Sequence, residues 1–328
     1  MNRRAFIAGL SSAVAWPVLG RAQQSQPIRR IGILMPFPPE NATARERVRA
    51  FREELRKRGW ASSVNVQFDE RWTVDNMELI HSAAENLVEL KPDVILAAGG
   101  RVIPILMKLT RSIPIVYPGG TEPVARGYVQ SLAHPGGNVT GFAVMEASVI
   151  GKQLQTLKEI APHLARISMI YNPDNPAGAI AGRGFEDAAR PLGVEATIVH
   201  IHGLSDIERA AEAVARQENG GIFVALDATI EGLVEQTVAT IAQHRLPAIY
   251  PDRVFVVNGG LVSYGADRTD LYRRAATYVD RILRGEKPGD LPYQQPTKYD
   301  LVINLGAAKA LGLTIPPKLL FTADEVIE

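Results

Sequence analysis

Residues 113–118 read Ile113-Pro-Ile-Val-Tyr-Pro118, and residues 246–251 repeat the pattern as Leu246-Pro-Ala-Ile-Tyr-Pro251. A second pair of segments precedes them in the same order. Asp93-Val-Ile-Leu-Ala-Ala-Gly99 comes before the first copy, and Gly221-Ile-Phe-Val-Ala-Leu-Asp227 comes before the second. Short apolar runs of this kind are typical of buried strands. Because both pairs keep their order, we interpret the chain as two halves that share one architecture.

Strand-like runs alternate with helical patterns in both halves. Val48, Phe51 and Leu55, for example, share one helix face. Thr43-x-x-Glu46 and Ser205-x-x-Glu208 have the spacing of capping boxes that open helices. The predicted strands lie at 31–35, 64–68, 94–98, 113–117, 167–171, 194–199, 222–226 and 248–250. Such alternation is typical of a parallel sheet covered on both faces, so we predict an α/β fold of two doubly wound parallel-sheet lobes.

The two lobes are expected to be joined closely, because no Gly/Ser-rich linker separates them. The chain is expected to cross between them three times, near 132–143, near 259–265 and again within 291–305. The helix predicted at 267–283 then returns to the first lobe. We expect residues 28–143 plus 264–290 to form the first lobe and residues 144–263 plus 291–328 to form the second.

The first 22 residues have the features of an export signal. A charged start with Arg3-Arg4 is followed by Phe6-Ile7, a short apolar stretch and the small-x-small end Gly20-Arg21-Ala22. The paired arginines resemble a twin-arginine signal. We expect cleavage after Ala22 and a soluble mature protein. The alternative is an N-terminal anchor that is not cleaved.

Charge and cysteine content exclude several classes of function. The 328 residues include 36 Lys and Arg against 35 Asp and Glu. Removal of the three arginines in residues 1–22 leaves 33 basic residues, so a role in binding nucleic acid is not expected. The chain has no cysteine, which excludes disulfides, thiolate metal sites and a lipid anchor on an N-terminal cysteine.

Ligands in open α/β sheets bind beyond the carboxyl ends of the strands, so two facing lobes would form a cleft lined by strand ends. The residues predicted to bind a small organic ligand there are Met35, Gly99, Gly100, Arg101, Tyr117, Gly120, Thr121, Tyr171, Asn172, Asp227, Tyr250 and Tyr264. The four tyrosines suggest aromatic walls for a flat ligand. The alternative is that two or more of them pack in the core.

Two of these positions carry opposite charges in matching places. Gly99-Gly100-Arg101 follows a predicted strand and opens a helix, where backbone N–H groups and a guanidinium suit a ligand carboxylate. The alternative is a glycine turn beside a solvated arginine. Asp227 ends the corresponding strand of the second half and would face a ligand ammonium group, so the pair would suit a zwitterion. Asp227 also stands where a helix N-cap is expected, and both roles are compatible.

No catalytic residue, cofactor or metal site is predicted. The sequence contains no GxxxxGK[ST], GxGxxG, GxSxG, HExxH or EF-hand pattern. His200 and His202 would share one strand face, but no third metal ligand has informative spacing. A non-enzymatic protein is therefore expected.

The chain resembles the periplasmic substrate-binding proteins of ABC transporters, in the family that includes tryptophan- and tyrosine-binding members. The segments that carry the resemblance lie at 113–117, 131–141, 246–250, 259–265, 275–285, 291–297 and 303–328. Among them, Pro135-Gly-Gly-Asn-Val-Thr-Gly141 and the stretch from Ile303 to Glu328 are the most specific together. The resemblance covers essentially all of the chain after residue 22.

The resemblance implies a type I periplasmic-binding fold that closes on its ligand by a hinge, with an ABC permease in the inner membrane as partner. It implies no chemistry on the solute, which we expect to be an amino acid or an aromatic or other organic carboxylate. Family members with amino-acid ligands often place hydroxyl residues where this chain has Gly99-Gly100-Arg101, a departure that favours a more anionic ligand. A soluble periplasmic monomer without a lipid anchor is expected. A sensor that docks on a membrane receptor is the alternative.

Overall fold

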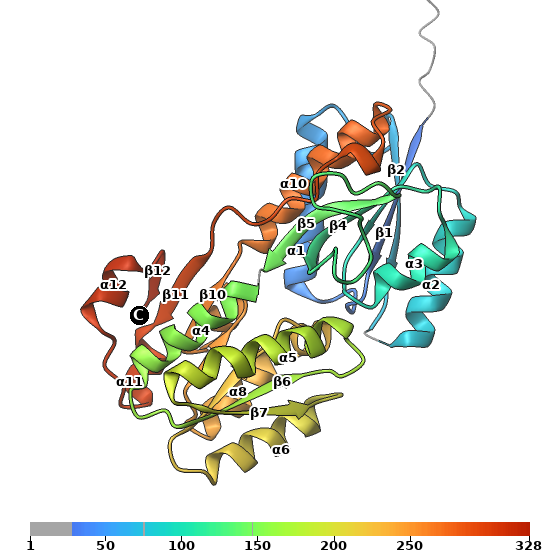
Figure 1. Ribbon diagram of the computed structural model, residues 1–328. Helices are drawn as coiled ribbons and strands as arrows, with labels where there is room; N and C mark the ends of the chain where they lie inside the picture. The colour runs from blue at the N-terminus through green and yellow to red at the C-terminus, as the bar shows by residue number, and fades with distance from the viewer. Residues whose placement is uncertain (1–27, 75, 146) are drawn as a thin grey trace, which may run out of the picture.

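The computed structural model describes residues 28–74, 76–145 and 147–328, so the predicted export signal lies outside the described residues. The first half forms a five-stranded parallel sheet of order β2-β1-β3-β4-β5 (Figure 1). Its elements are β1 (Arg29–Met35), α1 (Ala42–Lys57), β2 (Val66–Trp72), α2 (Met77–Glu89), β3 (Val94–Ala97), α3 (Val102–Leu109), β4 (Ile115–Thr121) and β5 (Val139–Met145).

The second half forms a seven-stranded sheet of order β12-β11-β10-β9-β8-β6-β7, in which only β10 and β11 pair antiparallel. Its strands are β6 (Arg166–Tyr171), β7 (Glu195–His200), β8 (Gly220–Val224), β9 (Ala248–Tyr250), β10 (Val262–Gly265), β11 (Asp300–Asn304) and β12 (Glu325–Ile327). The remaining helices are α4 (Ala147–Ile160), α5 (Pro176–Ala189), α6 (Leu204–Ala215), α7 (Ala228–Glu231), α8 (Val234–Gln243), α9 (Arg253–Val257), α10 (Arg268–Leu283), α11 (Leu305–Ala310) and α12 (Pro317–Thr322), with 3-10 turns at Arg190–Leu192 and Pro288–Asp290.

Both sheets are covered on both faces, which confirms the predicted class. Alternate residues of β1 enter different cores: Ile31 and Ile33 pack with α1 and α10, and Leu34 packs with α2 and α3. In the second sheet, Met169 packs on the side of α4 and α5, whereas Ile170 packs on the side of α6 and α8. Because a strand directs successive side chains to opposite faces, a continuous apolar run requires helices on both sides.

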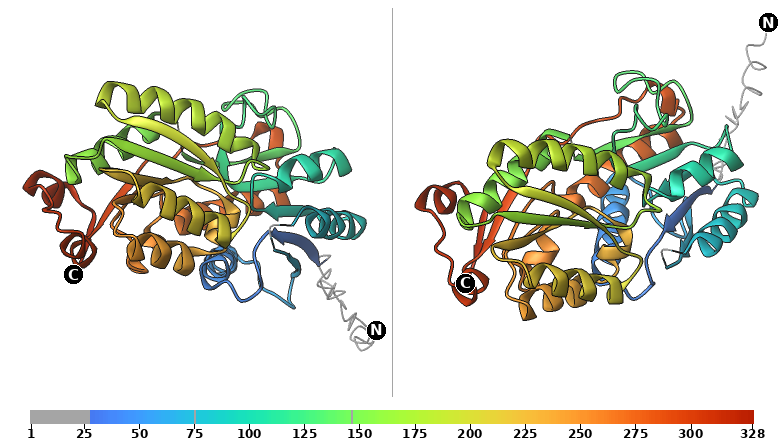
Figure 2. Two further views of the ribbon diagram at one scale, coloured as in Figure 1. Left: turned by 90° about the horizontal axis from the view of Figure 1, so that it is seen from below. Right: turned by 60° about the horizontal axis from the view of Figure 1, so that its bottom comes forward.

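The chain passes between the two sheets three times. It leaves the first sheet after β5 for α4, and it returns after β10 to α10, which packs against α1 and β4. The segment after α10 then leads back to β11. Leu291 and Tyr293, predicted to lie in the second lobe, are buried among first-lobe residues. Figure 2 shows α12 and the C-terminus at the end of the second lobe that lies farthest from the first sheet.

The helix starts differ from the predicted capping boxes. Helix α1 begins at Ala42, so Thr43 and Glu46 lie inside it, and Asn41 is the cap, with its Oδ1 2.8 Å from the backbone nitrogen of Ala44. Helix α6 likewise begins at Leu204, one residue before Ser205. An asparagine oxygen satisfies the first helical N–H groups as well as a hydroxyl does. Among the described residues, no helix has the length and apolar character needed to cross a membrane.

Candidate functional site

A pocket lies between the two lobes at the carboxyl ends of their strands. Its lining comprises Phe37, Ala98, Gly99, Gly100, Tyr117, Pro118, Gly119, Thr121, Arg126, Arg268 and Tyr272 from the first lobe, and Asn175, Ala177, Leu226, Asp227, Ala228 and Glu231 from the second. The space is about 470 Å³ including its open mouth. Five of the predicted ligand-binding residues line it, namely Gly99, Gly100, Tyr117, Thr121 and Asp227.

The first-lobe wall begins with two glycines before α3. Gly99 has a φ of +85°, and a Cβ on it would lie 2.6 Å from the Pro36 side chain, so the position requires glycine. Helix α3 starts directly afterwards, and no side chain caps its N-terminus. The N-terminus of a helix carries partial positive charge, so this wall favours an anionic group.

Two first-lobe cations line the pocket, Arg126 and Arg268, and of these Arg126 lies beside the two glycines. Its Nη2 lies 2.9 Å from the carbonyl oxygen of Gly100, and its guanidinium stacks 4.6 Å from the ring centre of Tyr128. Its Nη1 is buried and has no hydrogen-bond partner among the described residues. A buried donor without a partner is costly, and a ligand carboxylate would satisfy it. Sequence reasoning missed Arg126, although it stands in the loop after a strand end.

Asp227 lies on the opposite wall of the pocket and caps α7, which confirms the N-cap expected from the sequence. Its Oδ1 accepts from the backbone N–H of Thr229 at 2.9 Å, and its Oδ2 accepts from Nδ2 of Asn175 at 3.1 Å. Asn175 in turn caps α5 by accepting from the backbone N–H of Ala177. Asp227 is only 2% exposed. The second-lobe wall therefore holds a fixed carboxylate.

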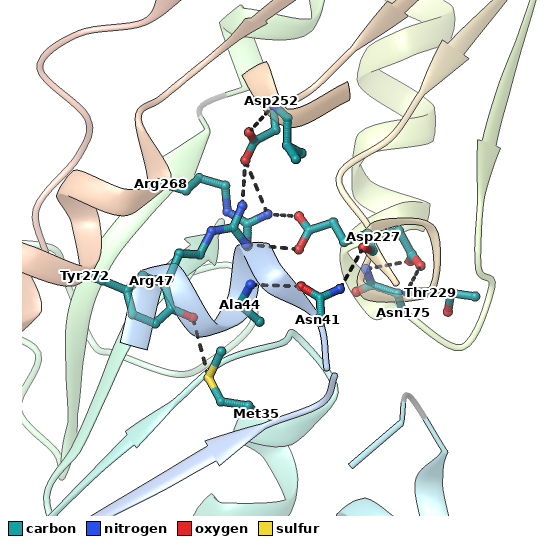
Figure 3. A network of polar contacts seen from close by, with 12 residues as sticks. Met35, Asn41, Ala44, Arg47, Asn175, Asp227, Thr229, Asp252, Arg268 and Tyr272 are labelled. Carbon is teal, nitrogen blue, oxygen red and sulfur yellow. Dashed lines mark hydrogen bonds and ion pairs between the residues drawn. The ribbon is translucent and has the colours of Figure 1, made fainter. Parts of the chain in front are cut away.

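A cluster of four buried charges, which we call the charged quartet, adjoins the pocket and joins the lobes (Figure 3). It consists of Arg47 on α1, Arg268 at the start of α10, Glu231 on α7 and Asp252 before α9. Arg47 lies 3.4 Å from Glu231 and 2.7 Å from Asp252, and Arg268 pairs with Glu231. Burial and the nearby Arg47 charge lower the pKa of Arg268 to about 9, so it remains protonated at neutral pH.

Three of the four predicted tyrosines lie away from the pocket. Tyr171 packs in the core with its ring edge against His200, and Tyr250 stacks on Phe255 with ring centres 5.2 Å apart. Tyr264 stacks on Tyr299. Of the four predicted tyrosines, only Tyr117 lines the pocket, where Phe37 and Tyr272 contribute two further aromatic rings.

Four other predicted residues also lie outside the pocket lining. Met35 is fully buried, with its sulfur 3.8 Å from the Tyr272 hydroxyl. Gly120 packs under Tyr293, whose hydroxyl would lie 1.9 Å from a Cβ at that position. Asn172 donates to the hydroxyl of Thr229.

Arg101, the predicted anion-binding arginine, is the fourth. Its guanidinium pairs across the lobe boundary with Asp174 at 3.5 Å, and its side chain is 7% exposed. Arg101, the residue directly before α3, contacts Asp174 before α5 and does not line the pocket. The cation predicted beside the glycines is therefore supplied by Arg126, 25 positions later in the chain.

The two histidines considered as a metal pair are occupied by protein contacts. Nε2 of His200 lies 3.2 Å from the Tyr171 hydroxyl, and His202 lies beside Asp206. Within the described part of the chain, no three His, Asp or Glu side chains group as metal ligands.

Known proteins resemble this chain over most of its length. The family model described as "ABC transporter substrate binding protein" matches residues 36–327. A tyrosine-binding protein of Clostridioides difficile is 26% identical over 265 residues, covering 81% of this chain and 76% of the relative.

Solved structures share the fold. A conserved domain protein from Vibrio cholerae superposes with a TM-score of 0.85 at 26% identity, covering 91% of this chain and 99% of that one. The ABC domain in complex with L-Trp from Streptococcus pneumonia has a TM-score of 0.83 at 23% identity, with the same coverage. A ligand-free, open substrate binding protein from Clostridium difficile has a TM-score of 0.65 at 22% identity, covering 92% and 99%.

Proposed function

Because the chain belongs to the ABC transporter substrate-binding protein family, we propose that it captures a small organic solute between its lobes and delivers it to an ABC permease. Such proteins act outside the cytoplasm and bind solutes without altering them. For this chain we propose that it acts in the periplasm as a monomer, after export by the twin-arginine-like segment at 1–22.

The unpartnered Nη1 of Arg126 in the inter-lobe pocket is the observation that carries this proposal. We assign it to a ligand carboxylate, together with Gly99, Gly100 and Thr121 on the same wall. Asp227 faces that wall from the second lobe and would accept from a ligand ammonium group. A zwitterionic amino acid fits both walls, and the tyrosine-binding and L-Trp-bound relatives support this class of ligand. A simple carboxylate would use the first wall alone.

The arrangement of the lobes supports a hinge that closes on the solute. At nearly equal identity and coverage, the present arrangement matches the L-Trp complex better than the ligand-free open structure. The charged quartet joins residues of both lobes, so a hinge that opens the lobes would separate its ion pairs. A solute held by both walls binds the closed form more tightly than the open one and shifts the population toward it.

Native mass spectrometry of protein purified without refolding tests this function. We expect a co-purified small molecule that contains a carboxylate, and we expect it to be lost from the Arg126→Ala protein. A solute that lacks a carboxylate, or one retained equally by that variant, would contradict the assignment. Turnover of the bound molecule would contradict a binding role.

A further inference from the structure

A second cavity lies beside the inter-lobe pocket described above, and its lining is mostly apolar. It measures about 530 Å³ including its mouth, and we call it the apolar chamber. Its apolar lining is formed by Ile150 of α4, by Ala225 and Leu226 after β8, and by five residues of α5, namely Ala177, Gly178, Ile180, Ala181 and Gly184. Thr121 and Glu122, at the end of β4, contribute from the first lobe, so the chamber too lies on the lobe boundary.

The apolar chamber adjoins the inter-lobe pocket. Thr121, Ala177 and Leu226 line both cavities. Leu226 directly precedes Asp227 in the chain, and Ala177 is the residue whose N–H Asn175 caps. A ligand whose charged head contacts Arg126 and Asp227 therefore has the chamber directly beside it.

The chamber owes its space to missing side chains on one face of α5. Two glycines of this helix are fixed by packing: a Cβ on Gly178 would lie 2.0 Å from the Tyr171 ring, and one on Gly182 would lie 2.8 Å from Ile198. Gly184 has no such constraint, because its Cβ would only reach ordinary contact, 3.6 Å from Ile150. Glycine within a helix is unfavourable relative to alanine. The absence of a side chain at Gly184, next to Ala181, keeps the chamber open.

The chamber leaves apolar surface only partly covered. Ile180, Ala181 and Leu226 are half-buried, although they lie inside a cavity between the lobes. Removal of such surface from water is favourable in proportion to its area. The lining offers no aromatic ring, and Thr121 and Glu122 are its hydrogen-bonding side chains. A sugar or a polar side chain would lose its hydration there with few partners in return.

Resting on the solute-capture role proposed above, we propose that the apolar chamber is the side-chain subsite of the ligand, and that the ligand is an α-amino acid or carboxylate with an apolar side chain. The head group lies between Arg126 and Asp227, and the side chain extends along α5. The subsite would then select ligands by the length of an apolar chain.

Calorimetric titration of a homologous series tests the proposal. Alanine, 2-aminobutyrate, norvaline and norleucine differ by one methylene at each step, and each buried methylene should strengthen binding about fourfold. The whole series should then span about 60-fold. In Ala181→Leu the added side chain fills the chamber. We therefore expect affinity to stop increasing with the length of the ligand side chain, while free alanine binds as tightly as it does to the wild type. Gly184→Leu fills the same chamber from the same helix face and should have the same effect on the series. It replaces Ala181→Leu in the experiment if that variant folds poorly.

Ala179→Leu is the matched control, because Ala179 is exposed on another face of α5. This variant should keep the fourfold steps. Equal affinities across the wild-type series, or an increase with chain length that neither chamber variant changes, would overturn the proposal. Failure of the series and of the matching fatty acids to bind would overturn it as well. Capture itself would still stand if native mass spectrometry found another solute in the protein, so the two failures are distinguishable.

Discussion

Nη2 of Arg47 lies 2.7 Å from Oδ2 of Asp252, although the two residues are 205 positions apart and belong to different lobes. Both side chains are nearly buried, at 3% and 11% exposure. Opening of the lobes would separate them and return both charges to water. The four side chains of the charged quartet therefore stay buried only while the two lobes are together. They lie at the edge of the pocket where the solute is expected to bind.

Arg47→Met should favour the open form. The variant removes one cation and leaves the carboxylates of Glu231 and Asp252 underneutralised when the lobes close, and breaking a buried pair costs about 3–5 kcal/mol. We expect solute affinity to fall about 100-fold or more. Arg49→Met, on the exposed side of the same helix, is the control and should change affinity little. Equal affinities for the two variants would show that the quartet does not contribute to closure.

Arg126→Ala should weaken the binding of carboxylates selectively. A hydrogen bond to a charged group contributes about 1.5–3 kcal/mol, which corresponds to a loss of about 10- to 150-fold. The neutral amide of the same ligand should lose much less. Arg101→Ala, which removes the pair with Asp174 outside the pocket, should affect the acid and the amide alike. Isothermal titration of both variants separates these patterns, and a carboxylate-selective loss in Arg101→Ala instead would reverse the assignment.

Asp227→Asn should separate the two roles of Asp227. Asparagine is as good an N-cap as aspartate, but its Nδ2 would face the Nδ2 donor of Asn175, so thermal stability should fall moderately through the loss of that one hydrogen bond. The loss of charge should lower the affinity for ligands that carry an ammonium group. The affinity for carboxylates that lack an ammonium group should not change. Asp227→Ala should in addition cost about 0.5–2 kcal/mol of stability through the lost cap. If Asp227→Asn binds an α-amino acid as well as the wild type does, the residue is only a cap.

The tyrosines should divide into one ligand contact, Tyr117, and three residues that pack away from the pocket. Tyr250→Ala removes a buried ring that stacks on Phe255 and should cost about 3–5 kcal/mol of stability while leaving affinity for the solute largely intact. Tyr117→Ala should lower affinity as well, because Tyr117 lines the pocket. Melting curves and titrations of the two variants check this division. A loss of affinity in Tyr250→Ala beyond that in Tyr117→Ala would restore the aromatic wall predicted from the sequence.

The sheets could be predicted from local sequence, and the side-chain directions could not. Runs such as Ile113–Tyr117 and Ala248–Tyr250 are apolar enough to mark buried strands, and their order along the chain indicated two similar lobes. Whether a strand-end tyrosine faces the cleft depends on which face of the sheet its neighbours cover. Tyr171 and Tyr250 are covered by helices of their own lobe, and Tyr117 lies at the lobe boundary.

The charged residues of the site illustrate the same limit. Asp227 was predicted because it ends a strand, and strand ends meet at one edge of a parallel sheet. Arg126, Arg268 and Glu231 come from a loop and two helix ends, where sequence carries no signal of direction. Their convergence depends on how the lobes meet, which no local pattern describes. An asparagine before a helix, as at Asn41 and Asn175, is a local signal and was available from the sequence.

Small-angle scattering of the protein with and without its solute tests the central claim most directly. The solute would be identified by native mass spectrometry, removed by exhaustive dialysis and added back to saturation. We predict a larger radius of gyration in the solute-free protein and a return to the compact value on addition, with Arg47→Met remaining extended at the same solute concentration. An unchanged radius of gyration at saturating solute would contradict capture by closure of the two lobes.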